Sequence, residues 1–274
     1  MQPGLLAISA VALFASGCSQ GAEVLLCDGS PSVRLAFRNT GGGQVLAGSQ
    51  VLSENGFNFL VVDGQCHYWA RPDAYSDIRE GQLANSEADV LTAKLRVADW
   101  DALAGDYFDD LCDGPTREYR FADQRINVFS SCGGPTTSQA VDGLLAATLS
   151  QLQSLYDVGA PVAGSVRFVL TVQDGVAWSI GVKSLAVPWP LSSDPSTLAL
   201  TFEQANSYLP GSSQSAPPPD ADALRSVRRS FTAAGGLPLS GGFVPLLGSE
   251  NKKYGLFARD SIPLEDGQGL LHLD

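Results

Sequence analysis

The four cysteines that follow Cys18 constrain the fold of the chain more than any other feature. They are Cys27, Cys66, Cys112 and Cys132. An even number of cysteines in an exported chain predicts two disulfide bonds. Three connectivities are possible, and we favour Cys27–Cys66 with Cys112–Cys132 because each pair brackets a predicted hairpin. No pair has Cys-x-x-Cys spacing and His67 is the only histidine nearby, so the pattern does not predict a zinc site.

The N-terminus predicts that the chain leaves the cytoplasm. The apolar stretch Gly4–Phe14 has the length of a signal-peptide hydrophobic region, and it is shorter than the roughly 20 residues that span a membrane. The small residues Ala15-Ser16-Gly17 follow and precede Cys18. This segment resembles the lipobox of bacterial lipoproteins. It departs from that pattern in two ways, because Ala15 stands where leucine is common and no Lys or Arg precedes the apolar stretch.

The lipobox resemblance implies a location. In that family the cysteine is diacylated on its sulfur and the chain is cut directly before it. The resemblance therefore implies a signal peptide at residues 1–17, fatty acyl groups such as palmitate on Cys18, and a place in the bacterial cell envelope, at the outer membrane or the periplasmic face. Two or three acyl chains anchor a protein stably, whereas one holds it only reversibly. An ordinary secretory signal is the alternative.

Composition predicts a folded chain with an acidic surface. Hydrophobic residues make up 44% of the 274 residues and charged residues 17%, which is typical of a globular protein with a real core. The net charge of −12 disfavours nucleic acid as a partner and adsorption to anionic lipid. Attachment to a membrane would therefore depend on Cys18.

Residue periodicity predicts an α+β fold in which antiparallel hairpins pack against helices. The predicted strands are Val33–Arg38, Phe57–Ala70 with a turn at Asp63-Gly64, Thr116–Phe121, Arg125–Phe129, Val166–Val172, Ala177–Leu185, Phe243–Leu247 and Tyr254–Ile262. The predicted helices are Glu87–Leu95, a short one from Asp99, Val141–Tyr156, one near 202–208 and Ala221–Ala234. A boundary at Gly159–Gly164 divides the chain into a disulfide-bonded α+β domain at 18–160 and a second α+β domain at 161–274.

Four segments carry a further resemblance. They are Cys27-Asp28-Gly29-Ser30, Arg34–Arg38, Asp63–Cys66 and Cys112–Thr116. These segments are similar to those of uncharacterised exported lipoproteins of the myxobacterial kind, over residues 24–158. The resemblance implies an extracytoplasmic location and a disulfide-bonded α+β build. It supplies no catalytic residue and no cofactor.

The densest polar feature is an acidic run in the first half. Its members are Asp99, Asp101, Asp106, Asp109, Asp110 and Asp113. Carboxylates in a loop suit calcium, and a pair of them suits glycoside hydrolysis. The spacing does not fit an EF-hand, however. The interposed Trp100, Tyr107, Phe108 and Leu111 instead favour a solvated acidic face with apolar side chains anchored in the core.

Two features of the second half carry alternatives. The helix Ala221–Ala234 places Arg225, Arg228 and Arg229 opposite its apolar stripe. This basic face is either solvated, or it docks an acidic partner or the acidic half of the same molecule. Trp189 lies between two prolines and is either a loop anchor or an exposed recognition residue.

These observations favour a cell-envelope lipoprotein that is a non-enzymatic binding or structural module. We predict no catalytic, cofactor-binding or metal-binding residue. The expected partners are a membrane, through the lipid on Cys18, and a protein of the envelope. One alternative is an extracytoplasmic hydrolase that uses carboxylates of the Asp99–Asp113 region, and another is an inhibitor of a secreted enzyme.

Overall fold

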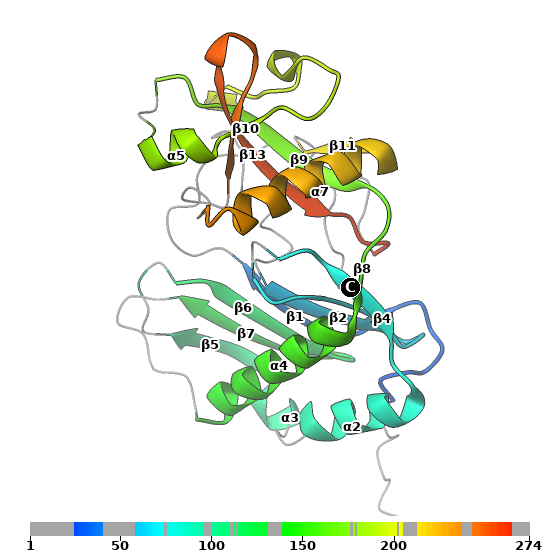
Figure 1. Ribbon diagram of the computed structural model, residues 1–274. Helices are drawn as coiled ribbons and strands as arrows, with labels where there is room; N and C mark the ends of the chain where they lie inside the picture. The colour runs from blue at the N-terminus through cyan, green and yellow to red at the C-terminus, as the bar shows by residue number, and fades with distance from the viewer. Residues whose placement is uncertain are drawn as a thin grey trace, which may run out of the picture.

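The chain folds into two β-sheets with helices packed on them. The computed structural model describes residues 25–40, 58–73, 76–95, 100–109, 112, 114–130, 139–175, 178, 180–201, 203–204, 213–236 and 243–264. Helices α2 (Asn85–Leu95) and α4 (Gln139–Val158) cover the outer face of the first sheet, and α7 (Pro218–Ala233) lies between the two sheets (Figure 1). The predicted α+β class with antiparallel strands is confirmed.

The first sheet comes from the N-terminal part of the chain and is antiparallel except at one edge. Strand β5 (Gly105–Asp109), which includes part of the acidic run, pairs in parallel with β7 (Gln124–Ser130). The short helix α3 (Trp100–Leu103) precedes β5. Across the sheet the order within the described residues is β5 (Gly105–Asp109), β7 (Gln124–Ser130), β6 (Thr116–Phe121), β1 (Val33–Thr40), β2 (Asn58–Asp63), β3 (His67–Arg71), β4 (Arg79–Gln82) and β8 (Ala160–Pro161).

The main core lies between this sheet and its helices. In α4 the buried Val141, Leu144 and Leu152 follow helical spacing and face the sheet. Alternate strand residues such as Phe37 and Tyr119 meet them, with ring centroids 5.0 Å apart. The apolar side chains of α4 pack on one face of the sheet. Their helical spacing is visible in the sequence, so the pattern was enough to predict this helix.

The second sheet follows the crossover at β8. Its helix α7 buries Leu224, Val227 and Phe231 against it. Within the described residues the strand order is β10 (Val187–Pro188), β12 (Val244–Leu247), β13 (Lys253–Asp260), β9 (Val166–Val172) and β11 (Gln214–Ala216), with the 3-10 turns η1 (Pro195–Thr197) and η2 (Ser249–Asn251) in the connections.

The prediction of a returning strand at Ala177–Leu185 is wrong. The end of this segment is the helix α5 (Ile180–Leu185). Both edges of β9 are taken by strands from later in the chain: β13 pairs along its whole length and β11 pairs along its first half. The strands that flank β9 therefore come from later segments and not from the residues that directly follow it.

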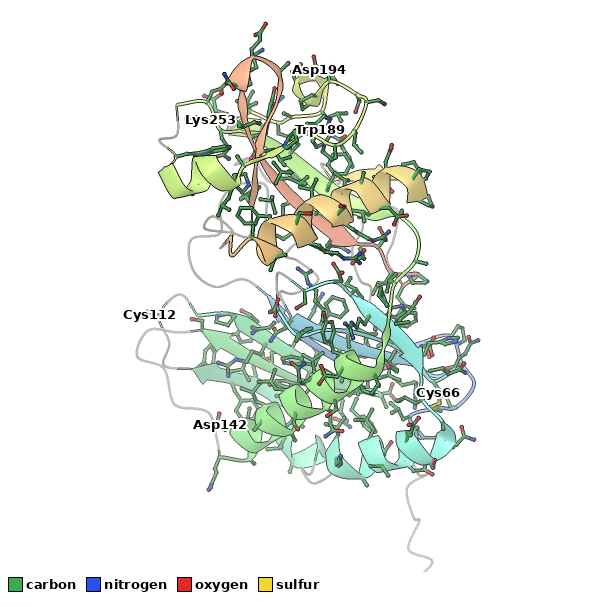
Figure 2. All side chains as sticks on the ribbon, viewed as in Figure 1. Cys66, Cys112, Asp142, Trp189, Asp194 and Lys253 are labelled. Atoms are coloured by element: carbon green, nitrogen blue, oxygen red, sulfur yellow. A yellow bond between two sulfur atoms is a disulfide. The ribbon has the colours of Figure 1, made fainter. Side chains whose placement is uncertain are left out.

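Trp189 is an anchor of the second core. Its indole Nε1 donates a hydrogen bond to the carbonyl of Ser193 at 2.8 Å, and its ring centroid lies 6.3 Å from that of Phe168. The side chain packs beneath the loops of the second sheet (Figure 2). The anchor interpretation of Trp189 therefore holds.

The two sheets meet at a seam that is part apolar and part ionic. Its apolar part brings Ile78 and Trp69 of the first sheet together with Val162 and Ile262. Val162 lies just after β8 and Ile262 just after β13, so the crossover and the end of β13 both pack on the first sheet. A backbone hydrogen bond also joins the crossover to the first sheet, because Val162 N donates to Ile78 O at 3.1 Å.

The ionic part of the seam explains the basic face of α7. Arg225 Nε donates to Asp260 Oδ1 at 2.6 Å, and Arg228 contacts both Asp260 and Asp77. Arg229 Nη2 lies 2.8 Å from Asp77 Oδ2. Because Asp77 belongs to the loop before β4, Arg228 and Arg229 dock α7 onto the molecule's own first sheet. Arg225 instead holds α7 to the end of β13. Arg225 and Arg228 are buried, so this part of the helix face is not solvated.

Two of these arginines hold the Asp77 carboxylate ionised. Burial acts to raise the pKa of Asp77, but the charges of Arg228 and Arg229 outweigh it and hold the pKa below its ordinary value of 3.8. Asp260 is 1% exposed and also accepts a hydrogen bond from Ile78 N at 3.1 Å. Arg225, Arg228 and Ile78 N together offset the cost of burying the Asp260 carboxylate. These contacts fix the position at which the chain leaves β13.

Candidate functional site

A groove of about 690 Å³ lies on the first sheet beside the seam. Strands β3 and β4 supply its floor, and segments from both ends of the described chain supply its walls. It is lined by Pro31, Asp63, Gln65, His67, Tyr68, Trp69, Glu80, Gly81, Gln82, Ala160, Pro263 and Leu264. Its volume falls in the range of small-molecule sites, about 300–1,000 Å³.

The turn between β2 and β3 shapes one end of the groove. Asp63 ends β2 and its Oδ1 accepts hydrogen bonds from the backbone N–H groups of Gln65 and His67, both at 2.9 Å. Cys66 then takes a positive φ of 69°, which closes the turn. The Asp63 carboxylate is thereby fixed beside the imidazole, with Oδ2 3.6 Å from Nδ1 of His67.

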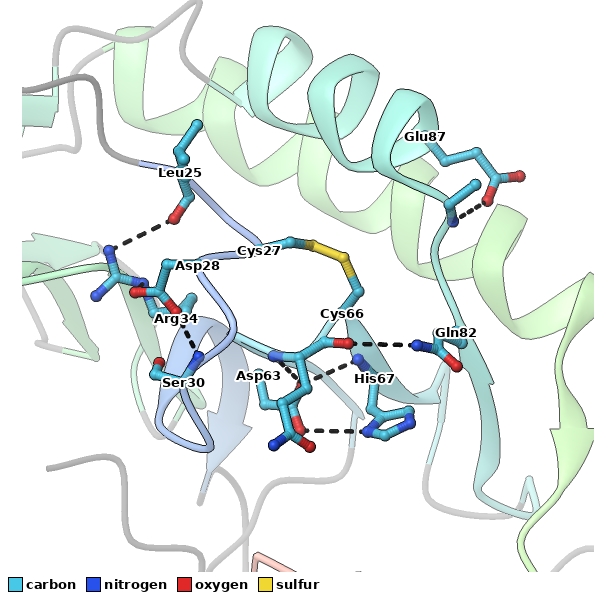
Figure 3. The surroundings of a disulfide bond; sticks show 12 residues. Leu25, Cys27, Asp28, Ser30, Arg34, Asp63, Cys66, His67, Gln82 and Glu87 are labelled. Carbon is cyan, nitrogen blue, oxygen red and sulfur yellow. Dashed lines mark hydrogen bonds and ion pairs between the residues drawn. A yellow bond between two sulfur atoms is a disulfide. The ribbon is translucent and has the colours of Figure 1, made fainter.

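A disulfide holds the segment before β1, which we call the N-terminal arm (residues 25–32), against this turn. Cys27 is bonded to Cys66, as predicted (Figure 3). Gly29 N donates to Gly64 O at 2.6 Å, and Gly64 N donates to Ser32 O at 2.9 Å. The arm carries Pro31, so the cross-link places one wall of the groove.

Gly64 has no room for a side chain at this contact. A Cβ there would lie 2.7 Å from the backbone oxygen of Ser30 and would also collide with the Asp28 carboxylate. The glycine is therefore needed for the close approach of the arm to the turn.

Alternate residues of β3 face the groove, opposite their partners on β4. Trp69 is paired with Glu80 and His67 with Gln82. Trp69 Nε1 donates to Glu80 Oε2 at 3.2 Å, and the rings of His67 and Trp69 have centroids 6.2 Å apart. Indole, imidazole and carboxylate thus form one continuous surface.

The electrostatic character of the groove is acidic. Its ionised lining groups are the carboxylates of Asp63 and Glu80, and no Lys or Arg is among the described residues that line it. Burial, and after it the charge of Glu87, raises the pKa of Tyr68. The Tyr68 hydroxyl donates to the carbonyl of Leu155 on the helix side of the sheet, so this phenol takes no part in groove chemistry.

This set of groups suits binding better than covalent catalysis. A triad needs a Ser, Cys or Thr nucleophile beside a histidine that a carboxylate orients. His67 has such a carboxylate in Asp63, but no Ser, Cys or Thr is among the described residues that line the groove. What remains is an apolar wall with a few converging polar groups, the usual composition of a ligand pocket.

The residues predicted from sequence have mixed outcomes. Cys112 is disulfide-bonded, while Cys18 and Cys132 lie outside the described residues. Gly114 N donates to Ser130 Oγ at 2.6 Å across the open end of the β6–β7 hairpin. The pairing of Cys112 with Cys132 stays a prediction. Cys112 and Cys66 lie at opposite ends of the first sheet (Figure 2).

Asp106 is the one member of the acidic run whose side chain is among the described residues. Asp99, Asp110 and Asp113 lie outside the described residues, as do the side chains of Asp101 and Asp109. Asp106 is described, and its carboxylate accepts a hydrogen bond from Asn127 at 2.7 Å. No group of three or more His, Cys, Asp or Glu suited to a metal ion occurs among the residues that the structure describes.

Two of the four apolar residues predicted to anchor this run in the core have described side chains, and these two differ in burial. Tyr107 packs against the main core, as expected. Phe108 is 42% exposed, so the expectation that it is a core anchor is wrong. In β5 these neighbours point to opposite faces, and only one face is covered by helices. The side chain of Trp100 and all of Leu111 lie outside the described residues.

Sequence reasoning missed the groove, although one signal was present. Asp63 and His67 are four residues apart across an Asp-Gly turn, a spacing that can bring a carboxylate back to an imidazole. Glu80, by contrast, lies on a short strand with no periodic pattern, and it could not have been assigned to the same site.

Comparison with protein-family models, with curated proteins and with solved structures gives no match to the chain. Within the described residues no helix combines the length and the apolar character that crossing a membrane requires.

Proposed function

We propose that the protein is an extracytoplasmic lipoprotein of the bacterial cell envelope, anchored through Cys18, and that its folded part is a non-enzymatic binding module. The observation that carries this proposal is the Cys27–Cys66 disulfide, to which the bonded state of Cys112 adds. Disulfides persist in oxidising compartments such as the periplasm and the cell surface. The predicted signal peptide at residues 1–17 supports the same location.

The groove supports the binding part of the proposal. It is concave, its wall is largely apolar, and its Asp63 carboxylate is held by hydrogen bonds from two backbone N–H groups. The Glu80 carboxylate is held by the indole of Trp69. Such preorganised sites bind small molecules with little entropy cost on the protein side.

An anchor at Cys18 would also place the groove near the membrane. Cys18 and Leu25 are seven residues apart, and a fully extended chain of that length spans at most roughly 25 Å. The disulfide then fixes the arm beside the groove. A ligand of this groove would therefore be met close to the membrane surface.

Intact-mass spectrometry of the native protein tests the proposal. We expect a chain that begins at Cys18 and carries acyl mass, and that gains two hydrogens for each disulfide when it is reduced. The Cys18→Ala variant is the control, and it should lose the acyl mass and leave the membrane fraction. An unmodified, uncleaved Cys18 would overturn the anchor. Free thiols at Cys27 and Cys66 in the native protein would overturn the location.

A further inference from the structure

We propose that the groove binds a small organic cation, an alkylammonium group carried on a compact apolar body. This inference rests on the binding function proposed above and names the chemical class of the ligand. Three properties of the groove support it: its charge, the state of its carboxylates and the nature of its walls.

The charge of the groove selects against anions. Asp63 and Glu80 contribute two negative charges, and among the described lining residues no Lys or Arg offsets them. The net charge of −12 on the whole chain adds an attractive potential for cations. A ligand carboxylate or phosphate would meet the repulsion of both carboxylates, with no Lys or Arg among the described lining residues to offset it.

The two carboxylates differ in what they offer a ligand. Asp63 is 4% exposed, and its Oδ1 already accepts two backbone N–H groups, so it acts mainly through its charge. Glu80 is half-buried and uses Oε2 for the indole of Trp69. Its Oε1 accepts no hydrogen bond from the described residues. Glu80 is therefore the group that can accept a hydrogen bond from a ligand ammonium.

The walls suit an apolar body next to that charge. Pro31, Ala160, Pro263 and Leu264 supply aliphatic surface from three separate segments. The buried Trp69 adds the edge of an indole whose N–H is bound to the Glu80 carboxylate. A free inorganic cation would gain nothing from these walls.

Calorimetric titration with three matched probes tests the inference. Tryptamine, tryptophol and indole-3-propionate have the same indole body and carry a positive, a neutral and a negative end. We expect tryptamine to bind about tenfold more tightly than tryptophol, the usual magnitude of one charge-assisted hydrogen bond, and indole-3-propionate to bind most weakly.

Two variants locate the effect. Glu80→Gln keeps an acceptor for the Trp69 indole and removes the charge, so we expect tryptamine affinity to fall about tenfold while tryptophol affinity is unchanged. Asp89→Asn removes one charge from an exposed position on α2, away from the groove, and should change neither. Thermal unfolding of both variants confirms that each remains folded.

The outcomes separate this inference from the binding function itself. If tryptophol or indole-3-propionate binds as tightly as tryptamine, the groove is a binding site but the cation inference is wrong. An unchanged tryptamine affinity in folded Glu80→Gln also overturns the inference. If none of the three probes binds, both the inference and the groove as a binding site fail. The lipid anchor, tested separately at Cys18, is unaffected by any of these results.

Discussion

Replacing Cys27 and Cys66 by serine tests how the N-terminal arm is held. The bond joins residues separated by 39 positions, so it closes a long loop in the unfolded chain. The entropy of closing a loop of that size corresponds to about 4 kcal/mol of stability at 25 °C. A typical domain is stable by only about 5–15 kcal/mol. We therefore expect the double variant to lose a large part of the free energy of unfolding.

Urea unfolding measures this loss, with the fluorescence of the four tryptophans and far-UV circular dichroism as two probes. The midpoint should fall in the variant, and the difference in extrapolated free energy should be near 4 kcal/mol. The matched control is Cys112→Ser with Cys132→Ser. If these two residues are bonded, their loop is about half as long and its loss should cost about 3 kcal/mol.

Reducing agent provides a second control. It should destabilise the wild type by the sum of both bonds, and the Cys27/Cys66 double variant only by the bond that remains. A loss below about 1 kcal/mol in that variant, with an unchanged denaturant slope, would refute the reasoning. The hydrogen bonds between the arm and Gly64 would then suffice to hold the arm without the cross-link.

Three further predictions use matched pairs or pH. Gly64→Ala should destabilise the protein by about 1–3 kcal/mol through overpacking, whereas Gly143→Ala, on the open face of α4, should stabilise it by about 0.5–1 kcal/mol in the same urea assay. Asp260→Ala leaves buried arginines uncompensated and should cost about 3–5 kcal/mol, but Asp222→Ala, at a carboxylate 78% exposed, should cost less than about 1 kcal/mol. The pKa of Asp77 is lower in the folded than in the unfolded chain, so its contribution is present above its ordinary pKa of 3.8 and is lost as pH falls through the folded value. The stability difference between wild type and Asp77→Asn should therefore shrink between pH 6 and pH 3, and a constant difference would contradict the role of Asp77.

Local patterns predicted the elements that bury one clean face. Val166–Val172 is rich in β-branched and other apolar residues, with the uninterrupted apolar run Phe168–Leu170 at its centre, and β9 has these bounds. The leucine stripe of Val141–Tyr156 lies within α4, which extends two residues further at each end. Each segment therefore carries a local signal of its own, a short apolar run for the strand and a helical spacing of leucines for the helix.

Elements whose pairing depends on distant strands escaped prediction. Gly105–Asp109 reads Gly-Asp-Tyr-Phe-Asp, which has no alternation, and it forms an edge strand by pairing in parallel with β7. Arg79–Gln82 carries no apolar residue, yet it pairs with β3 and β8. Conversely, Ala177–Leu185 has strand-like residues, yet its end forms the helix α5. Strand identity in these cases depends on partners that are distant in the sequence, a property of the whole sheet.

The candidate site was hidden for the same reason. Sequence analysis found Cys66 and considered His67, which lie on one rim, but Glu80 and Leu264 come from segments that meet only when both sheets are in place. The basic face of α7 was recognised, yet its partner Asp77 lies about 150 positions earlier in the chain. Long-range pairing of this kind has no local signature.

The groove depends on two cross-links of different chemistry. The disulfide fixes the wall that carries Pro31, and the buried ion pairs of Asp260 fix the strand that leads to Pro263 and Leu264. Asp260 is three residues from Pro263, so a shift of β13 at the seam moves that wall directly. Neither cross-link touches the space that a ligand would occupy, and both hold backbone rather than ligand-contacting side chains. A site held at both walls in this way keeps Glu80 and Trp69 at a fixed distance from the aliphatic surface opposite, which is the preorganisation that selective recognition of a small cation requires.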